Sequence, residues 1–152
     1  MVIREIESAD LAPFIDLCAE HAEFERMSYE RQGKLAMLQR ALACSPPTLY
    51  GWVAASQQQL LAYATVTIDF STWSAAHFMH LDCLYVRAAY RGHGLGSELM
   101  KAAIAEARRR GIRELQWQTP EWNVEADRFY RRLGASARTK VRYSLAVAPS
   151  SS

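Results

Sequence analysis

Three glycines at alternate positions constrain this chain more than any other feature. They are Gly92, Gly94 and Gly96 in the stretch YRGHGLGSELM, between a strand-like run and a helical pattern. A glycine inside a regular element costs about 0.5–1 kcal/mol relative to alanine, so three in close succession need a compensating interaction. At the start of a helix, the first N–H groups have no partner within the helix, and the helix dipole adds partial positive charge. The pattern therefore predicts a backbone site for an anion such as phosphate, with Arg91 as an added positive charge.

Hydrophobic periodicity predicts strands and helices on both sides of this turn. Period-two alternation predicts a strand at residues 2–7, and strand-like runs predict further strands at residues 49–56, 60–70, 77–86, 113–118 and 140–147. Helical spacing and capping residues predict helices at residues 11–24, 32–43, 98–110 and 124–133. The order βααβββαβαβ indicates an α/β fold, with a single mixed and mostly antiparallel central sheet flanked by helices. We expect one domain over residues 1–148 and a flexible tail at residues 149–152.

Composition narrows the class of protein. Half of the 152 residues are hydrophobic, and no apolar run approaches the roughly eighteen residues that span a membrane. The first residues, MVIREIESAD, lack the apolar core of a secretory signal. The three cysteines are widely spaced and odd in number, which disfavours a disulfide framework and favours a cytoplasmic protein. They form no zinc pattern with the four histidines, so we expect no metal.

Charge is distributed unevenly along the chain. Residues 1–80 carry 5 basic and 9 acidic side chains, a net charge of −4, whereas residues 81–152 carry 13 and 7, a net charge of +6. A basic half suits an anionic partner and an acidic half suits a cationic one, although solvated helix faces produce the same pattern. The arginines at 108–110 lie at a predicted helix C-terminus, where cations suit the helix dipole, so we expect no nucleic-acid partner.

The spacing of the glycines separates this turn from other phosphate-binding turns. The P-loop pattern ends in Gly-Lys-Ser/Thr, which is absent, and in G-x-G-x-x-G the third glycine falls one residue later than here. The stretch instead matches R-x-x-G-x-G through Arg91, Gly94 and Gly96. In this it resembles the acetyl-coenzyme A motif of the GNAT superfamily of N-acetyltransferases. The resemblance implies the GNAT fold and acetyl-CoA as co-substrate, its pyrophosphate held by the turn; the alternative is an ordinary tight strand-to-helix turn.

Two longer segments narrow the resemblance. LDCLYVRAAYRGHGLGSELM and EWNVEADRFYRRLGA resemble the polyamine and thialysine acetyltransferase branch, and HAEFERM resembles its first helix. This implies transfer of an acetyl group from acetyl-CoA to a primary amine, by direct attack in a ternary complex. The implied acceptor is a small cationic amine, such as a polyamine, thialysine or an amino acid. A homodimer is also implied, because the branch is dimeric.

The resemblance assigns catalytic roles to two side chains. It places Tyr130 beside the coenzyme sulfur as general acid, and the pKa values of a phenol and a thiol lie within about two units of each other. Asp82 is the expected acceptor of the amine's proton, directly or through water, since a carboxylate in a largely apolar strand needs a reason. The branch carries Glu then Asp where this chain has Asp82 and Cys83. The alternative to a catalytic role is that Tyr130 is a core aromatic residue. For Asp82 the alternative is an ion pair with a basic residue.

Coenzyme binding is implied for a strand edge, the glycine turn and the last helix. The backbone of Leu84 and Val86 is expected to bind the pantetheine arm, and the Leu84 N–H to stabilise the acetyl carbonyl oxygen. Asn123 either holds the pantetheine or caps a helix, and Arg131 or Arg132 either reaches the phosphates or is a surface charge. The full expected set is Leu84, Tyr85, Val86, Arg91, Gly92, His93, Gly94, Leu95, Gly96, Ser97, Asn123, Tyr130 and Arg132.

Acidic residues predict where the acceptor binds. Glu25 in HAEFERM and Asp82 are the expected substrate-binding residues, and the alternative for Glu25 is a solvated helix face. Two other functions stay open. One is a protein acetyltransferase acting on a lysine or an N-terminal amine, which needs an open groove. The other is a coenzyme A-binding regulatory module without turnover, against which Tyr130 and Asp82 argue.

Overall fold

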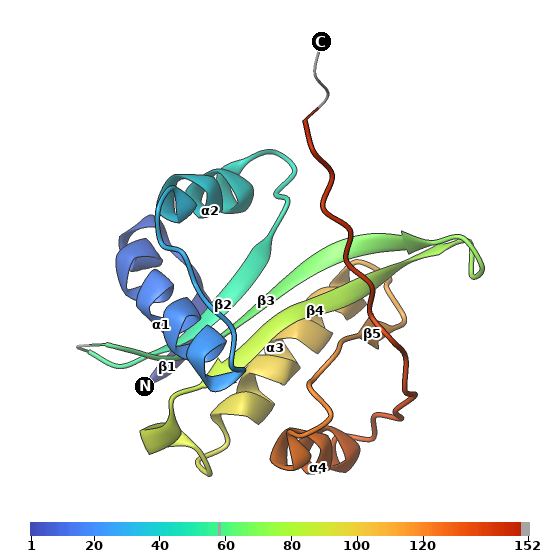
Figure 1. Cartoon of the computed structure of the whole chain (residues 1–152). Helices are drawn as coiled ribbons and strands as arrows, with labels where there is room; N and C mark the ends of the chain where they lie inside the picture. The colour runs from blue at the N-terminus through green and yellow to red at the C-terminus, as the bar shows by residue number, and fades with distance from the viewer. Residues whose placement is uncertain (58, 150–152) are drawn as a thin grey trace. The chain divides into compact units, whose positions relative to one another are not determined.

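The computed structural model describes residues 1–57 and 59–149 (Figure 1). The chain forms two compact units, Met1–Gln118 and Thr119–Ser152. The single domain expected over residues 1–148 stays a prediction. Of the expected tail at 149–152, residues 150–152 lie outside the described part of the chain.

The first unit contains a five-stranded sheet in the order β1-β2-β3-β4-β5. The first three pairings are antiparallel and the last, β4 with β5, is parallel, which confirms the predicted mixed and mostly antiparallel sheet. The strands are β1 (Val2–Glu5), β2 (Tyr50–Ala55), β3 (Leu60–Ser71), β4 (Ala76–Val86) and β5 (Leu115–Gln116).

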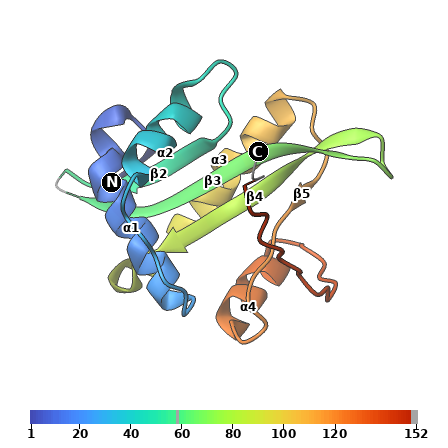
Figure 2. The same ribbon diagram turned by 45° about the horizontal axis from the view of Figure 1, so that its top comes forward.

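Three helices of this unit cover the two faces of the sheet. Helices α1 (Leu11–Phe24) and α2 (Lys34–Ala43) lie on one face and α3 (Leu95–Arg109) lies on the other (Figure 2). The second unit contains α4 (Val124–Arg132). Short 3-10 turns at Ser8–Asp10 and Ala88–Tyr90 precede α1 and the glycine-rich turn. No helix in the described ranges is both long and apolar enough to cross a membrane.

The apolar face of α1 forms the core that positions the site. This core consists of buried side chains of α1 and of strands β2, β3 and β4: Leu11, Phe14, Leu17, Val53, Ala55, Leu60, Tyr63 and Tyr85. Each fully buried large side chain contributes about 1.5–3 kcal/mol of hydrophobic stabilisation. The Phe14 and Tyr63 rings meet edge to face, with centroids 5.0 Å apart. This packing fixes α1 directly over β3 and β4.

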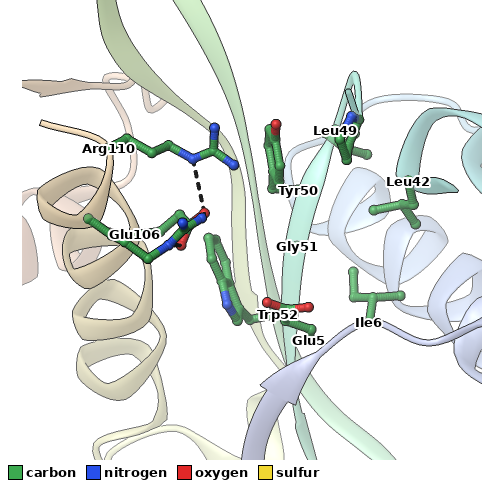
Figure 3. Close-up of a pocket in the computed structure, with 11 residues that line it drawn as sticks. Glu5, Ile6, Leu42, Leu49, Tyr50, Gly51, Trp52, Glu106 and Arg110 are labelled. Carbon is green, nitrogen blue, oxygen red and sulfur yellow. Dashed lines mark hydrogen bonds and ion pairs between the residues drawn. The ribbon is translucent and has the colours of Figure 1, made fainter. Parts of the chain in front are cut away.

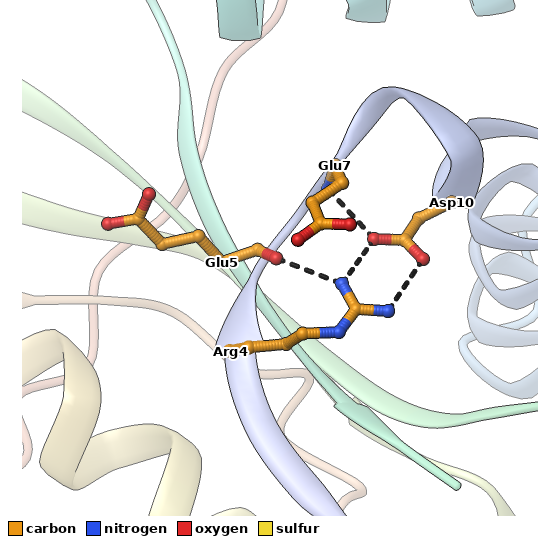
Figure 4. Close-up of polar contacts among 4 residues, drawn as sticks. All are labelled: Arg4, Glu5, Glu7 and Asp10. Carbon is orange, nitrogen blue, oxygen red and sulfur yellow. Dashed lines mark hydrogen bonds and ion pairs between the residues drawn. The ribbon is translucent and has the colours of Figure 1, made fainter. Parts of the chain in front are cut away.

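A polar cluster fixes the start of α1 (Figure 4). Arg4 on β1 donates from both Nη atoms to the Asp10 carboxylate, at 2.6 and 2.9 Å. The Glu7 N–H donates to the same carboxylate at 2.8 Å, so Asp10 closes a cap before the helix. Hydrogen bonds from Arg4 lower the pKa of Asp10. The cluster therefore ties α1 to the edge strand of the sheet.

The strand predicted at residues 140–147 is wrong, and two other predicted elements are present with different bounds. Residues 140–147 form no strand with any other described residue, and Val141, Tyr143, Leu145 and Val147 are 73–89% exposed. Alternation gives a segment the pattern of a strand, but ladder hydrogen bonds and a covered face are what stabilise one. The strand predicted at 113–118 pairs only at Leu115 and Gln116. Helix α3 begins at Leu95, three residues before the predicted start, because Gly94 serves as its N-cap.

Candidate active site

The glycine-rich turn presents free backbone donors at the start of α3. Gly92 and Gly94 have φ angles of +79° and +82°, which only glycine adopts readily, and a Cβ on either would meet open space. The first N–H of the helix with a backbone partner is that of Glu98, which donates to the Gly94 carbonyl at 3.0 Å. The three preceding N–H groups, at residues 95–97, make no hydrogen bond with a described residue. The Ser97 hydroxyl adds a further donor beside them.

The side chains of three other residues of this turn differ in their exposure to solvent. His93 is exposed. Leu95 is only 4% exposed, because its side chain belongs to the core under α3, so it offers a ligand only its backbone. Arg91 is exposed, and its Nε donates to the Val86 carbonyl at 2.9 Å. The Arg91 guanidinium lies over the Phe24 ring of α1 at 4.6 Å, so Arg91 joins the turn to α1.

Strand β4 has an unpaired edge next to this turn. Strand β5 pairs with β4 only at Met79 and His80, so residues 81–86 have no strand beyond them on that side within the described ranges. Leu84 and Val86 lie in this segment, half-buried. The Tyr85 ring is 9% exposed and packs toward α1, so only its backbone is available at the edge. An extended group is able to bind here as an added strand would.

A β-bulge places Asp82 on this segment. Thr65 pairs with Cys83 and Val66 pairs with Leu81, which leaves Asp82 as the extra residue. Bulges re-aim side chains and occur often beside active sites. The Asp82 carboxylate is 52% exposed and lies 3.8 Å from His80 Nε2. Adjacent residues of a regular strand point to opposite faces, but at this bulge the Cys83 thiol lies 3.7 Å from the Asp82 carboxylate.

The alternative for Asp82 was an ion pair with a basic residue. In the described part of the chain its one ionic neighbour is His80, and no arginine or lysine pairs with it. A half-exposed carboxylate without a guanidinium or ammonium partner is free to accept a hydrogen bond from a ligand. This arrangement suits a proton acceptor better than a structural ion pair.

Glu25 lies at the end of a hydrogen-bonded series on the same side of the sheet as α1. His21 Nε2 is 2.6 Å from Glu25 Oε2, and His21 Nδ1 is 2.7 Å from the Tyr63 hydroxyl. The His21 ring stacks on Tyr85, with centroids 5.0 Å apart and planes 19° apart. Glu25 is therefore not simply a solvated helix residue, because α1 and two strands hold it in place.

Two half-buried thiols line this series. Cys18 and Cys83 both contact the Tyr63 hydroxyl. Burial, together with the neighbouring Asp82 charge, raises the pKa of Cys83 to about 12. Burial also raises the pKa values of Cys18 and Tyr63. These groups therefore stay protonated at neutral pH, and through Tyr63 and Cys83 the side-chain contacts run without a break from Glu25 to Asp82.

The second unit carries the other predicted residues. The Asn123 side chain accepts from the Ala126 N–H at 3.2 Å, so it caps α4. Tyr130 is half-buried on α4, with its ring centroid 5.4 Å from that of Phe129. Arg131 forms an ion pair with Asp127 at 3.0 Å, whereas Arg132 is exposed and makes no ion pair with a described residue. Of the two arginines, Arg132 is the one available to a ligand.

Comparison with known proteins identifies the family. The acetyltransferase (GNAT) family matches residues 14–135, which include the strands that form the unpaired edge, the glycine-rich turn and α4. The chain belongs to the GNAT acetyltransferase family. It is an acyltransferase, and GNAT acetyltransferases transfer acetyl groups to amines and use acetyl-CoA.

Individual GNAT relatives are similar to this chain over most of its length. Thialysine N-epsilon-acetyltransferase of Bos taurus is 28% identical over 149 residues, covering 92% of this chain and 86% of that protein. Blasticidin-S acetyltransferase of Streptomyces morookaense is 34% identical over 108 residues, covering 69% and 74%. The structure of AAC(6')-Iy with the bisubstrate analog CoA-S-monomethyl-acetylneamine has a TM-score of 0.81 at 17% identity, covering 97% of this chain and 98% of that chain. That acetyltransferase has the same fold as this chain.

The first unit of this GNAT chain fits the coenzyme of its family. Open space at two left-handed glycines lets a pyrophosphate approach the backbone, and the free N–H groups of residues 95–97 are donors for it. The unpaired edge at residues 81–86 suits a pantetheine arm, which carries amide groups. Within the described ranges, no cluster of three or more His, Cys, Asp or Glu side chains is able to hold a metal ion.

The structure adds residues that the sequence did not indicate. His21, Tyr63 and His80 contact the predicted acids, directly or through one another. The spacing of His21 and Glu25, four residues apart in HAEFE, is the one local signal that places both on one helix face. Tyr63 is 38 residues from Glu25 in the chain and has no such signal, because only sheet pairing and helix packing bring it near.

A hollow of this unit lies away from the predicted site residues (Figure 3). Its volume is about 210 Å³, and it is bounded by β2, the C-terminal half of α3 and the residues around Leu42 and Leu49. Arg110 lies over the Tyr50 ring at 4.3 Å and forms an ion pair with Glu106 at 2.9 Å. The charges of Arg110 and Glu106 are therefore already paired with each other. None of its lining residues is a predicted site residue.

Proposed function

We propose that this chain transfers the acetyl group of acetyl-CoA to the primary amine of a small cationic acceptor, by direct attack in a ternary complex. The observation that carries the proposal is the geometry of β4 at residues 81–86. An unpaired strand edge and a half-exposed carboxylate at a bulge lie within six residues, next to a turn with free N–H donors. Hydrogen bonds of His21 connect Glu25, a second acid that suits a cation, to Tyr63, and the Cys83 thiol connects Tyr63 to Asp82.

Each proposed residue has a chemical task. The amine must be neutral to attack, and Asp82 accepts its proton directly or through water. The Leu84 N–H stabilises the acetyl oxygen as charge develops on it. Tyr130 donates a proton to the departing thiolate, a role that rests on the family resemblance. Bound acetyl-CoA supplies the activated thioester, and the donors of the glycine-rich turn hold its phosphates; a role of Arg132 at the phosphates rests on the family resemblance.

The protonated thiols of Cys18 and Cys83 favour direct attack over an acetyl-cysteine intermediate. A cysteine nucleophile must be a thiolate. Cys83 adjoins the proposed base, but with its pKa raised to about 12 it is almost entirely protonated at neutral pH. A two-step route through Cys83 is therefore disfavoured.

The test is thiol release from acetyl-CoA with a panel of amines, for the wild type, Tyr130→Phe and Asp82→Asn. The proposal expects turnover with small cationic amines, intersecting initial-rate plots, and a fall in kcat of roughly 10²–10⁴-fold in each variant. Turnover of peptides but not of small amines would indicate a protein acetyltransferase. Tight coenzyme binding without turnover of any acceptor would indicate a regulatory module.

Two further properties belong to the same proposal. We place the enzyme in the cytoplasm, supported by three cysteines that are all free thiols in the structure. We expect a homodimer, supported by exposed aromatic residues on the β3–β4 hairpin, where Trp73 is 98% exposed and Phe70 is 59% exposed. Sedimentation of the purified protein at several concentrations tests the dimer.

A further inference from the structure

The glycine-rich turn depends on its neighbours for a fixed conformation. Gly92 and Gly94 take left-handed angles, and glycine has more conformational freedom to lose than any other residue. A turn that becomes ordered only on binding weakens the affinity for its ligand, because that freedom is then lost in the same step. Residues that hold the turn in place beforehand therefore contribute to affinity without contacting the ligand.

Arg87 lies where strand β4 ends and the 3-10 turn Ala88–Tyr90 leads into the glycines. Its backbone is fixed on both sides: its N–H donates to the Leu61 carbonyl at 3.0 Å, and its carbonyl accepts from the Tyr90 N–H at 2.9 Å. Its side chain contacts α1, where Nε donates to Glu20 Oε2 at 3.0 Å. The Arg87 side chain is only 22% exposed, so this ion pair is partly shielded from solvent.

Gln59, directly before β3, joins Arg87 to the other end of the 3-10 turn. Arg87 Nη1 donates to Gln59 Oε1 at 3.1 Å, and Gln59 Nε2 donates to the Tyr90 hydroxyl. A guanidinium only donates hydrogen bonds, so the orientation of the Gln59 amide is determined. The connected side chains of this anchor network are Glu20, Gln59, Arg87 and Tyr90. Arg91 and the glycines follow the network directly in the chain.

We propose that Arg87 is a positioning residue that holds the glycine-rich turn in its coenzyme-binding conformation. Glu20 on α1 and Gln59 beside β3 fix the Arg87 side chain, so both ends of the 3-10 turn are tied to the rest of the unit. The N–H groups at residues 95–97 are then in position before the coenzyme phosphates arrive. This inference rests on the proposed function, which places the coenzyme at this turn, and it adds the residues that prepare the turn for binding.

Removal of Glu20 distinguishes positioning from direct phosphate binding, because the two roles of Arg87 predict opposite signs. If the Arg87 guanidinium bound a phosphate, Glu20→Ala would free it and remove a negative charge, and the coenzyme would bind more tightly. If Arg87 positions the turn, Glu20→Ala releases the anchor and the coenzyme binds less tightly. Glu23→Ala, at an exposed acid on the same helix, is the matched control for loss of charge.

Calorimetry with coenzyme A itself measures the effect without turnover. For Arg87→Met and Glu20→Ala we expect Kd to rise about fivefold, the scale of a partly exposed hydrogen bond between charged groups. The double variant should bind coenzyme A about as weakly as either single variant, because both changes release the same anchor. Glu23→Ala should stay within twofold of the wild type. Thermal unfolding of each variant reports loss of packing separately.

A shorter acetyl donor locates the effect at the turn. S-acetylpantetheine carries the thioester and the amide groups of acetyl-CoA but lacks its pyrophosphate, so the glycine-rich turn has no phosphate to bind. For Arg87→Met, with an amine that the wild type acetylates, we expect kcat/KM to fall about fivefold with acetyl-CoA and to stay within twofold with S-acetylpantetheine. The fall with acetyl-CoA should lie in KM, with kcat within twofold of the wild type.

Other outcomes overturn the inference. Tighter binding of coenzyme A by Glu20→Ala would show that Arg87 is a direct phosphate ligand, and an unchanged Kd in Arg87→Met would show that the turn needs no anchor. Equal losses with the two donors would show that Arg87 supports the whole site and not the turn. If the wild type binds coenzyme A but acetylates no amine, the proposed function fails alone, and the Kd values still decide this inference. A wild type that does not bind coenzyme A would overturn both.

Discussion

Gly94→Ala separates the conformational role of the glycine-rich turn from its role in binding. Gly94 has a φ of +82°, and an added Cβ would meet no atom of the chain within 4 Å. The cost to the free protein is therefore the left-handed conformation alone, about 1–2 kcal/mol. For a chain of this size that lowers Tm by roughly 2–8 °C.

The same methyl group has a larger effect on the coenzyme. It projects into the open space that a pyrophosphate needs to reach the free N–H groups of residues 95–97. Loss of one hydrogen bond to a charged group costs about 1.5–3 kcal/mol, so KM for acetyl-CoA should rise roughly 10–100-fold. KM for the amine should stay near its wild-type value.

The chain contains a matched control on the same helix. Gly111 follows the C-terminus of α3, has a φ of +71°, and likewise leaves an added Cβ in open space. Gly111→Ala should match Gly94→Ala in Tm but leave KM for acetyl-CoA unchanged. Equal KM values in the two variants would refute the assignment of the turn to the coenzyme, because strain would then account for both.

Two further predictions concern the fold and the thiols. The folded-state pKa of Asp10 is lowered, so its stabilisation is complete above the unfolded-state pKa near 4 and is lost as pH falls through the lower folded value. Asp10→Asn should reduce the free energy of unfolding by about 1–3 kcal/mol at pH 7 and progressively less below pH 4, and an undiminished difference at pH 2 would contradict the role of the Arg4 pair. Iodoacetamide at pH 8.5 should modify Cys44, whose pKa a hydrogen bond from Thr48 lowers, well before Cys83, whose thiolate fraction is roughly a thousandfold smaller than that of an ordinary cysteine. Peptide mass spectrometry over time gives the order, and faster modification of Cys83 would contradict its burial.

The sequence by itself determined the elements that depend on neighbouring residues. Helix α1 occupies the predicted residues 11–24, and Asn123 caps α4, which is one of the two roles expected for it. The glycine-rich turn also follows from local rules, because left-handed angles and free N–H groups arise within a few residues of the chain. These features need no distant partner, so periodicity and capping suffice to predict them.

Only the tertiary structure decided what depends on a partner. The apolar alternation at 140–147 predicted a strand, but no described residue pairs with it. The bulge at Asp82 arises from the register of β4 against β3, and it places the carboxylate beside Cys83. Contact between His21 and Tyr63 requires α1 to pack across the sheet. Register and packing are set by the summed burial of many side chains far apart in the chain, so a local pattern does not predict them.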